Sequence, residues 1–188
     1  MIITYHGEGC FKIQSGNQSV VIDPLNDRMK PDVILKTAVP FPDEIPDGKT
    51  ITGPGEYEID GIEIKGIQLV KESTGKLIKT AYLVTLEEIK LGFLGEAFEV
   101  PDAETLSFLG DAEILFLPTG EKPYLKPEEA ARVVKQIEPN IVIPSFYKSP
   151  KDFLEEMGQK AEPQEKLTIK KKEIIELGES TKVICLKV

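Results

Sequence analysis

The chain has 188 residues, of which 40% are hydrophobic and 29% charged, which is typical of one soluble globular domain. Its 32 acidic residues outnumber 23 basic ones, giving a formal charge of -9. This balance argues against a general affinity for nucleic acid, because phosphate binding needs clustered positive charge. A single histidine excludes a histidine-rich catalytic metal centre.

The N-terminal residues MIITYHGEGCF lack the basic and apolar regions of a secretory signal. No apolar run approaches the roughly 20 residues that span a bilayer. The sequence therefore predicts a cytoplasmic protein without a membrane segment. Cys10 and Cys185 lie in apolar or alternating runs, which favours buried reduced thiols over a disulfide between the terminal strands.

The first half of the chain is typical of β-structure. Asp60-Gly61 suits the two-residue turn of a hairpin, and three prolines predict a loop over residues 39–48. The predicted strands, in chain order, cover residues 2–6, 11–14, 19–23, 33–35, 57–59, 62–64, 80–86 and 89–95.

The second half alternates between helices and strands. Asp102 and Gly110 suit the two ends of a helix over residues 103–109, and Pro127 suits the first position of another. Strands are predicted at 113–117 and 141–144, with a helix after Ser149 and two strands within 166–188. Strands before helices predict two packed sheets with helices outside, in one domain over residues 1–188.

A series of short motifs runs through nearly the whole chain. They are Tyr5-His6-Gly7-Glu8-Gly9-Cys10-Phe11, Ile22-Asp23-Pro24, the segment from Leu35 to Asp43, the segment from Gly53 to Gly61, Phe93-Leu94-Gly95-Glu96, the segment from Pro127 to Ala131, and Ile143-Pro144-Ser145-Phe146-Tyr147. In this order they resemble the metallo-β-lactamase superfamily, and within it the small metal-dependent hydrolases related to ascorbate-6-phosphate lactonase. The resemblance implies an αββα sandwich of two mixed β-sheets flanked by helices.

The resemblance also shows where this chain departs from the family's metal motif. Histidines of the motif would fall at Ala38, Pro40 and Asp43, and its metal-binding aspartate at Pro42. Alanine and proline side chains have no atoms that bind a metal. The motif segment of this chain therefore lacks the imidazole ligands that the family uses.

Other positions of the family's site also carry different residues. Glu8 and Phe146 stand where the family has histidines, and Lys71 lies near a third in a looser alignment. Glu96 replaces an aspartate ligand, and Asp23 corresponds to a residue that supports a ligand histidine in relatives. His6 lies two residues from the family's first histidine and does not replace it.

These departures predict a protein with no catalytic residue, no metal ligand and no cofactor. Zinc is not expected, although Glu8, Asp43 and Glu96 leave open a weak site for the hard ions Mg²⁺ or Ca²⁺. Either an ion pair between Lys71 and a carboxylate is expected to fill the vacated cavity, or these side chains are expected to be solvated at the rim of a loop. The residues expected around a vestigial ligand-binding cleft are Glu8, Asp23, Ala38, Pro40, Asp43, Lys71, Glu96 and Phe146.

The leading hypothesis from the sequence is a catalytically inactive pseudo-hydrolase with a binding or structural role. One alternative is a residual hydrolase, of the lactonase or phosphodiester type, that uses the remaining carboxylates with a hard metal or by acid–base chemistry. Another alternative is a small-molecule binding module in the same cleft. The resemblance implies self-association as a homo-oligomer and leaves the identity of any protein or small-molecule partner open.

Overall fold

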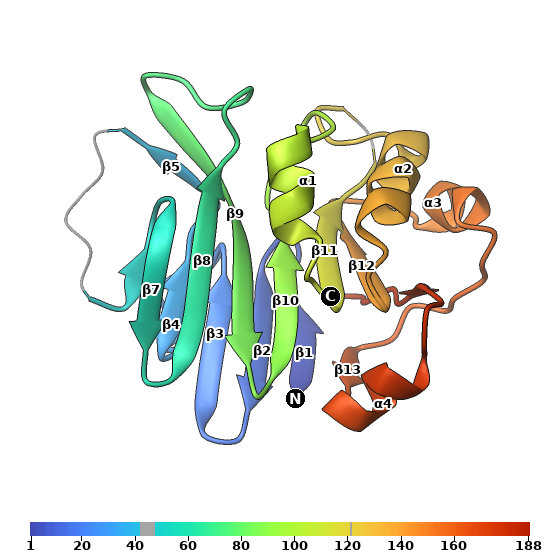
Figure 1. Ribbon diagram of the computed structural model, residues 1–188, viewed down its shortest axis with the longest axis horizontal. Helices are drawn as coiled ribbons and strands as arrows, with labels where there is room; N and C mark the ends of the chain where they lie inside the picture. Colours follow the sequence, from blue (N-terminus) through green and yellow to red (C-terminus); the bar gives the residue numbers. More distant parts are fainter. Residues whose placement is uncertain (42–47, 121) are drawn as a thin grey trace.

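The computed structural model describes residues 1–41, 48–120 and 122–188. Two β-sheets pack face to face (Figure 1). The first sheet has the strand order β13-β1-β2-β3-β4-β6. Its strands are β1 (Ile2–Tyr5), β2 (Phe11–Ser15), β3 (Gln18–Ile22), β4 (Val33–Leu35), β6 (Thr50–Ile51) and β13 (Lys166–Thr168).

The second sheet has the order β14-β12-β11-β10-β9-β8-β7, and β5 pairs with β9 beside this path. Strands β10, β11, β12 and β14 run parallel, whereas β7, β8, β9 and β10 are antiparallel neighbours. Its strands are β5 (Ala38–Pro40), β7 (Gly55–Ile59), β8 (Ile62–Gln68), β9 (Leu77–Leu86), β10 (Ile89–Phe93), β11 (Ile114–Pro118), β12 (Ile141–Ser145) and β14 (Lys182–Val183).

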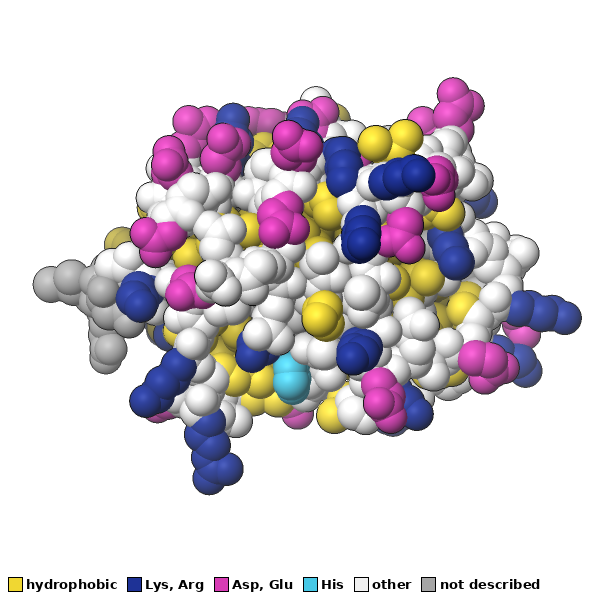
Figure 2. Space-filling view, turned by 90° about the horizontal axis from the view of Figure 1, so that it is seen from below, with side chains coloured by type: hydrophobic (Ala, Val, Ile, Leu, Met, Phe, Trp, Pro, Cys, Tyr) yellow, Lys and Arg dark blue, Asp and Glu magenta, His cyan; other side chains and the backbone are white. Residues whose placement is uncertain are grey.

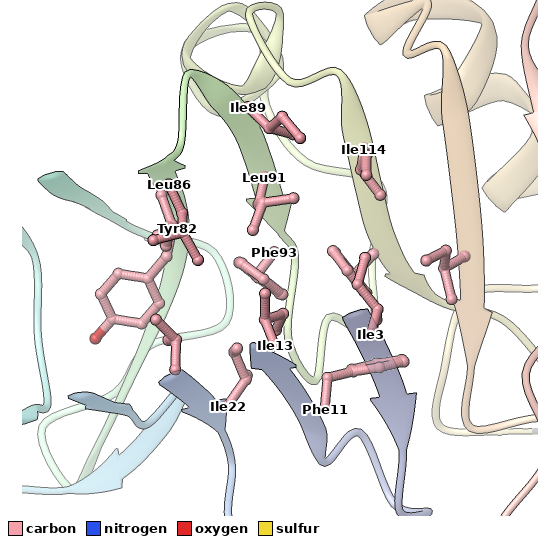
Figure 3. Packing of buried hydrophobic residues seen from close by; sticks show 14 of the residues in the cluster. Ile3, Phe11, Ile13, Ile22, Tyr82, Leu86, Ile89, Leu91, Phe93 and Ile114 are labelled. Atoms are coloured by element: carbon pink, nitrogen blue, oxygen red, sulfur yellow. The ribbon is translucent and has the colours of Figure 1, made fainter. Parts of the chain in front are cut away.

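The main core lies between the two sheets. Alternate residues of β2, among them Phe11 and Ile13, point inward because successive side chains of a strand face opposite sides. Figure 3 shows these side chains opposite Phe93 of the second sheet. The ring of Phe116 stacks on Phe93 at 4.4 Å between centroids and meets Phe11 edge-on at 4.7 Å. Aromatic contacts thus join the two sheets at the centre of the sandwich.

A second core lies on the other face of the second sheet, under three helices. These are α1 (Ala103–Leu109), α2 (Pro127–Ile137) and α3 (Lys151–Glu156). Strands β11 and β12 are buried along their whole length, since one face meets the first sheet and the other meets the helices. Among the described residues, no helix is long and apolar enough to cross a bilayer.

The structure confirms the predicted sandwich and several local signals. Asp60 and Gly61 have φ angles of 52° and 79°, as the tight hairpin turn requires. The Asp102 side chain accepts a hydrogen bond of 2.9 Å from the backbone N of Thr105 and caps α1. Cys10 and Cys185 are buried free thiols.

Two predictions about secondary structure were wrong in part. Val39 and Pro40, the first two residues of the predicted loop, belong to strand β5, and Pro40 is tolerated because it ends an edge strand. Residues 42–47 of the predicted loop lie outside the described residues. The segment 166–188 contains a helix, α4 (Lys171–Glu176), between its two short strands. This helix forms because Glu173 caps the backbone N of Lys170 at 2.7 Å and Ile174 is buried in the main core.

Candidate functional site

An open cleft of about 420 Å³ lies where loops leave both sheets. The loops that follow β1, β3, β10, β11 and β12 contribute side chains to it, as do Lys36, between β4 and β5, and Ala38, the first residue of β5. The carboxyl ends of parallel strands are the usual place for ligands in sheets of this kind. The lining consists of Glu8, Asp23, Pro24, Leu25, Lys36, Ala38, Glu96, Tyr124 and Phe146.

Asp23 is fixed in the cleft by two hydrogen bonds from Thr37. The backbone N of Thr37 donates to Oδ1 at 2.7 Å, and the hydroxyl donates to Oδ2 at 2.6 Å. Burial raises the pKa of Asp23 to about 6, against the two hydrogen bonds, which lower it. The nearby carboxylate of Glu96 raises this pKa further, and the ammonium group of Lys36 lowers it. The cleft therefore holds a carboxyl group that titrates close to neutral pH.

Left-handed backbone conformations gather around the cleft. Glu8, Asp23 and Phe146 have φ angles of 47°, 46° and 59°, which side chains other than glycine rarely adopt. Such conformations cost free energy and persist where surrounding structure enforces them, often at binding and catalytic sites. Gly9 packs so closely on Phe146 that an added Cβ would stand 2.4 Å from its ring. The chain thus keeps costly backbone geometry at this cleft.

A row of aromatic rings forms one wall. The ring of Phe146 stacks on Tyr124 with 4.2 Å between centroids and 24° between planes. Tyr124 in turn meets Phe98 edge-on at 5.8 Å. Burial raises the pKa of Tyr124, and the carboxylates of Glu96 and Glu8 raise it further, which places both acids near this phenol. The wall therefore combines an aromatic face with negative charge.

A buried ion pair anchors the segment that carries Glu96. The Lys79 side chain on β9 is 2% exposed, and its Nζ donates to the backbone carbonyl of Glu96 at 2.7 Å and to Oε2 of Glu72 at 3.0 Å. The Lys79 ammonium also lies 3.2 Å above the centroid of the Phe98 ring. Glu72 accepts backbone hydrogen bonds from Phe98 at 2.9 Å and Glu99 at 3.0 Å. Lys79 and Glu72 together therefore hold residues 96–99 in place.

Most of the predicted cleft residues lie together in the structure. Those that line the cleft are Glu8, Asp23, Ala38, Glu96 and Phe146. Pro40 is exposed at the end of β5 and is not part of the lining, and Asp43 lies outside the described residues. Lys71 borders a separate small hollow beside Asp102. The expected ion pair of Lys71 in the cleft is therefore not observed among the described residues, and the buried ion pair of this region joins Lys79 and Glu72 outside the lining.

The sequence did not point to Lys36, Tyr124 or Lys79. Tyr124 could have been found from its position after strand β11, because ligands usually bind at the carboxyl ends of parallel strands. Nothing in the sequence indicated that Lys79 is buried, because lysine is rarely buried and its partner Glu72 comes close only on folding. The one histidine, His6, is cyan in Figure 2 and lies partly exposed at the surface, with its Nε2 3.2 Å from the Thr4 hydroxyl.

Comparison with known proteins relates the chain to a family of hydrolases. A family model described as the beta-lactamase superfamily domain matches residues 2–145. A UPF0173 metal-dependent hydrolase of Thermococcus onnurineus is 30% identical over 135 residues, which are 65% of this chain and 59% of the relative. The aligned part thus spans less than two thirds of that relative. A second, from Methanopyrus kandleri, is 25% identical and covers 84% of this chain and 93% of its own.

Solved structures share the fold. A structure from Thermotoga maritima, described as a candidate Zn-dependent hydrolase of the metallo-beta-lactamase superfamily, aligns with a TM-score of 0.79 over 98% of this chain and 97% of its own, at 23% identity. A metallo hydrolase from Ignicoccus hospitalis aligns with a TM-score of 0.66 over 90% of this chain and 99% of its own, at 18% identity. At these identities the likeness extends to the fold alone.

The names of the relatives imply a metal, which would need converging ligand side chains in this chain. Within residues 1–41, 48–120 and 122–188, no group of three or more His, Cys, Asp and Glu side chains could hold a metal ion. Both oxygens of Asp23 accept hydrogen bonds from Thr37, and Ala38 and Phe146 have no ligand atoms. The described residues therefore do not fit the family's metal.

The relatives correct two predictions. A catalytically inactive pseudo-hydrolase without a cofactor was expected, but the curated relatives are named metal-dependent hydrolases, which favours the alternative of a hydrolase and implies a metal cofactor. The loss of histidines does not by itself imply inactivity, because carboxyl groups also transfer protons in hydrolysis. On its sequence match and its fold, the chain belongs to the beta-lactamase superfamily domain family and has the metallo-β-lactamase fold.

Proposed function

We propose that the protein is a hydrolase whose reaction takes place in the cleft around Asp23. The observation that carries this proposal is the Asp23 carboxyl group, which Thr37 holds at the cleft and whose pKa is raised to about 6. A group with such a pKa accepts and returns a proton readily near neutral pH, as a general acid–base catalyst must. The names of the curated relatives support hydrolysis as the reaction class.

The arrangement suits attack of water on a carboxylic ester or lactone. The Asp23 carboxylate takes a proton from water while the water oxygen forms a bond to the carbonyl carbon. The Lys36 ammonium group, which also lines the cleft, stabilises the negative charge that develops on the carbonyl oxygen. The bond from carbon to the leaving oxygen then breaks, and Asp23 returns the proton to that oxygen. The products are a carboxylic acid and an alcohol, and Asp23 is again ionised.

The charges of the cleft separate the two hydrolase types that the sequence left open. Glu8, Asp23 and Glu96 outnumber the single cation Lys36 among the lining residues. Like charges repel, so a phosphodiester enters this cleft less readily than an uncharged ester. The lactonase type of reaction is therefore the one proposed.

The openness of the cleft also supports a second candidate, a small-molecule binding module. A volume of about 420 Å³ is within the range of ordinary ligand pockets. The two candidates differ in turnover, because a binding module holds its ligand without changing it.

A screen of lactones and carboxylic esters tests the proposal. The purified protein is assayed in parallel with Zn²⁺, Mn²⁺, Mg²⁺ or a chelator, so that any metal requirement is measured. The Asp23→Asn variant is expected to lower kcat by about 100-fold or more, while Asp27→Asn, at an exposed position of the same loop, leaves it unchanged. Turnover that survives Asp23→Asn, or no turnover of any ester, would overturn the proposal.

A further inference from the structure

The two outer carboxylates of the cleft are not paired with any residue that the structure describes. In the part of the chain that the structure describes, the Glu8 and Glu96 side chains take part in no hydrogen bond or ion pair; the contact of Glu96 with Lys79 is through its backbone carbonyl. Glu8 is exposed and Glu96 is partly buried beside the aromatic wall. Their charges are therefore available to a ligand in the cleft.

The aromatic wall faces the same space. Tyr124 and Phe146 both line the cleft, and their stacked rings fix each other's orientation. The face of an aromatic ring carries partial negative charge and attracts cations. An aromatic ring in the lining next to two unpaired carboxylates suits organic ammonium groups, since it offers apolar contact and negative charge together.

We propose that the substrate of this cleft carries an organic ammonium group, which binds against the carboxylates of Glu8 and Glu96 and the ring of Tyr124. This inference rests on the proposed hydrolase function and adds a substrate class to it. The ester or lactone group of the same molecule then lies towards Asp23 and Lys36, the other charged residues of the lining.

Other charge types fit this cleft less well. A small dication needs three or more converging oxygen ligands, and the described residues provide no such group. An anion in the cleft is repelled by three carboxyl groups and attracted by one lysine. An ammonium group with methyl or methylene substituents needs no fixed coordination geometry, and its apolar substituents cover the Tyr124 ring.

Binding of choline and of two analogues with almost the same shape tests this inference without any need for turnover. The uncharged analogue is 3,3-dimethylbutan-1-ol, and the anionic one is 3,3-dimethylbutanoate. Affinities are measured by NMR chemical-shift titration of the full chain. Choline is expected to bind about tenfold more tightly than the uncharged analogue, which corresponds to about 1.4 kcal/mol, and to lose affinity as salt is added.

Matched variants locate the site. Glu96→Gln and Tyr124→Leu are expected to weaken choline binding about fivefold or more, whereas Tyr124→Phe, which keeps the ring, has little effect. Glu128→Gln, at an exposed position of α2, serves as the charge control and leaves binding unchanged.

Equal affinity for choline and the uncharged analogue, or choline binding that Glu96→Gln leaves intact, would overturn the inference. If the protein binds choline selectively but hydrolyses no ester, the hydrolase proposal fails and the ammonium site stands. Ester turnover without any preference for ammonium compounds refutes the substrate class alone.

Discussion

Thr37 and Asp23 are joined by two hydrogen bonds, one from the backbone N of Thr37 at 2.7 Å and one from its hydroxyl at 2.6 Å. Thr37 is 2% exposed, so its position is set by packing. Gly95 lies directly against it, with a backbone φ of +64° and space for a hydrogen atom only. The orientation of the proposed catalytic acid therefore depends on a contact between loops that are far apart in the sequence.

Replacing Thr37 by Val removes one hydrogen bond while keeping the shape of the side chain. The hydroxyl stabilises the ionised form of Asp23, so the pKa of Asp23 is expected to rise above about 6. Loss of a hydrogen bond to a charged group lowers the free energy of unfolding at pH 7 by about 1–3 kcal/mol. Carbon-detected NMR titration of the carboxyl group and urea unfolding measure the two effects. A pKa that stays at or falls below the wild-type value contradicts the role assigned to Thr37.

The raised pKa of Asp23 makes stability depend on pH. The folded protein holds this proton up to about pH 6, whereas the ordinary pKa is 3.8, so between these values the folded state binds more protons than the unfolded state. The free energy of unfolding therefore falls as pH rises through this window, by about 3 kcal/mol at most for this group.

Asp23→Asn removes this dependence. The free energies of unfolding of wild type and variant are measured in urea from pH 4 to pH 7, and their difference is taken so that the contributions of other groups cancel. As pH rises, the stability of the wild type is expected to fall relative to that of the variant, because only the wild type has the titrating carboxyl group. A difference that is constant over this range shows that Asp23 does not titrate there.

Gly95→Ala is expected to distort the site. A Cβ at Gly95 would stand 2.4 Å from the Cβ of Thr37, so Thr37 must move. Gly178 has a similar φ of +62° with nothing within 4 Å of an added Cβ, and Gly178→Ala is therefore a control for the backbone effect alone. The control costs about 1 kcal/mol of stability and Gly95→Ala costs about 1–3 kcal/mol more. Urea unfolding of both variants tests this, and equal losses would contradict the close contact.

Lys79→Met is expected to lower the free energy of unfolding by about 3–5 kcal/mol, because it leaves the Glu72 carboxylate buried without its cation. The double variant Lys79→Met/Glu72→Gln recovers part of the loss, since the stranded charge is gone. Lys65→Met, in the exposed pair of Lys65 with Glu56, changes stability by less than about 1 kcal/mol. Thermal and urea unfolding compare the variants, and a loss for Lys79→Met no larger than for Lys65→Met counts against a buried pair.

Local sequence determined much of the fold. The turn at Asp60-Gly61, the cap at Asp102 and the alternation of β2 each act within a few residues, so they are readable without the structure. Helix α4 was missed because its six-residue sequence is short and lies between two stretches that alternate like strands, and burial of Ile174 decides the outcome.

The sequence by itself determined the family and the positions of Glu8, Asp23 and Glu96, because these residues occupy ordered motifs that do not depend on contacts elsewhere. Only the tertiary structure decided what surrounds them. It brings Lys36 and Tyr124 to the cleft, and it selects Lys79 rather than Lys71 as the buried cation. The physical reason is that burial and charge pairing arise between segments far apart in the chain, and the pKa of Asp23 follows from that burial.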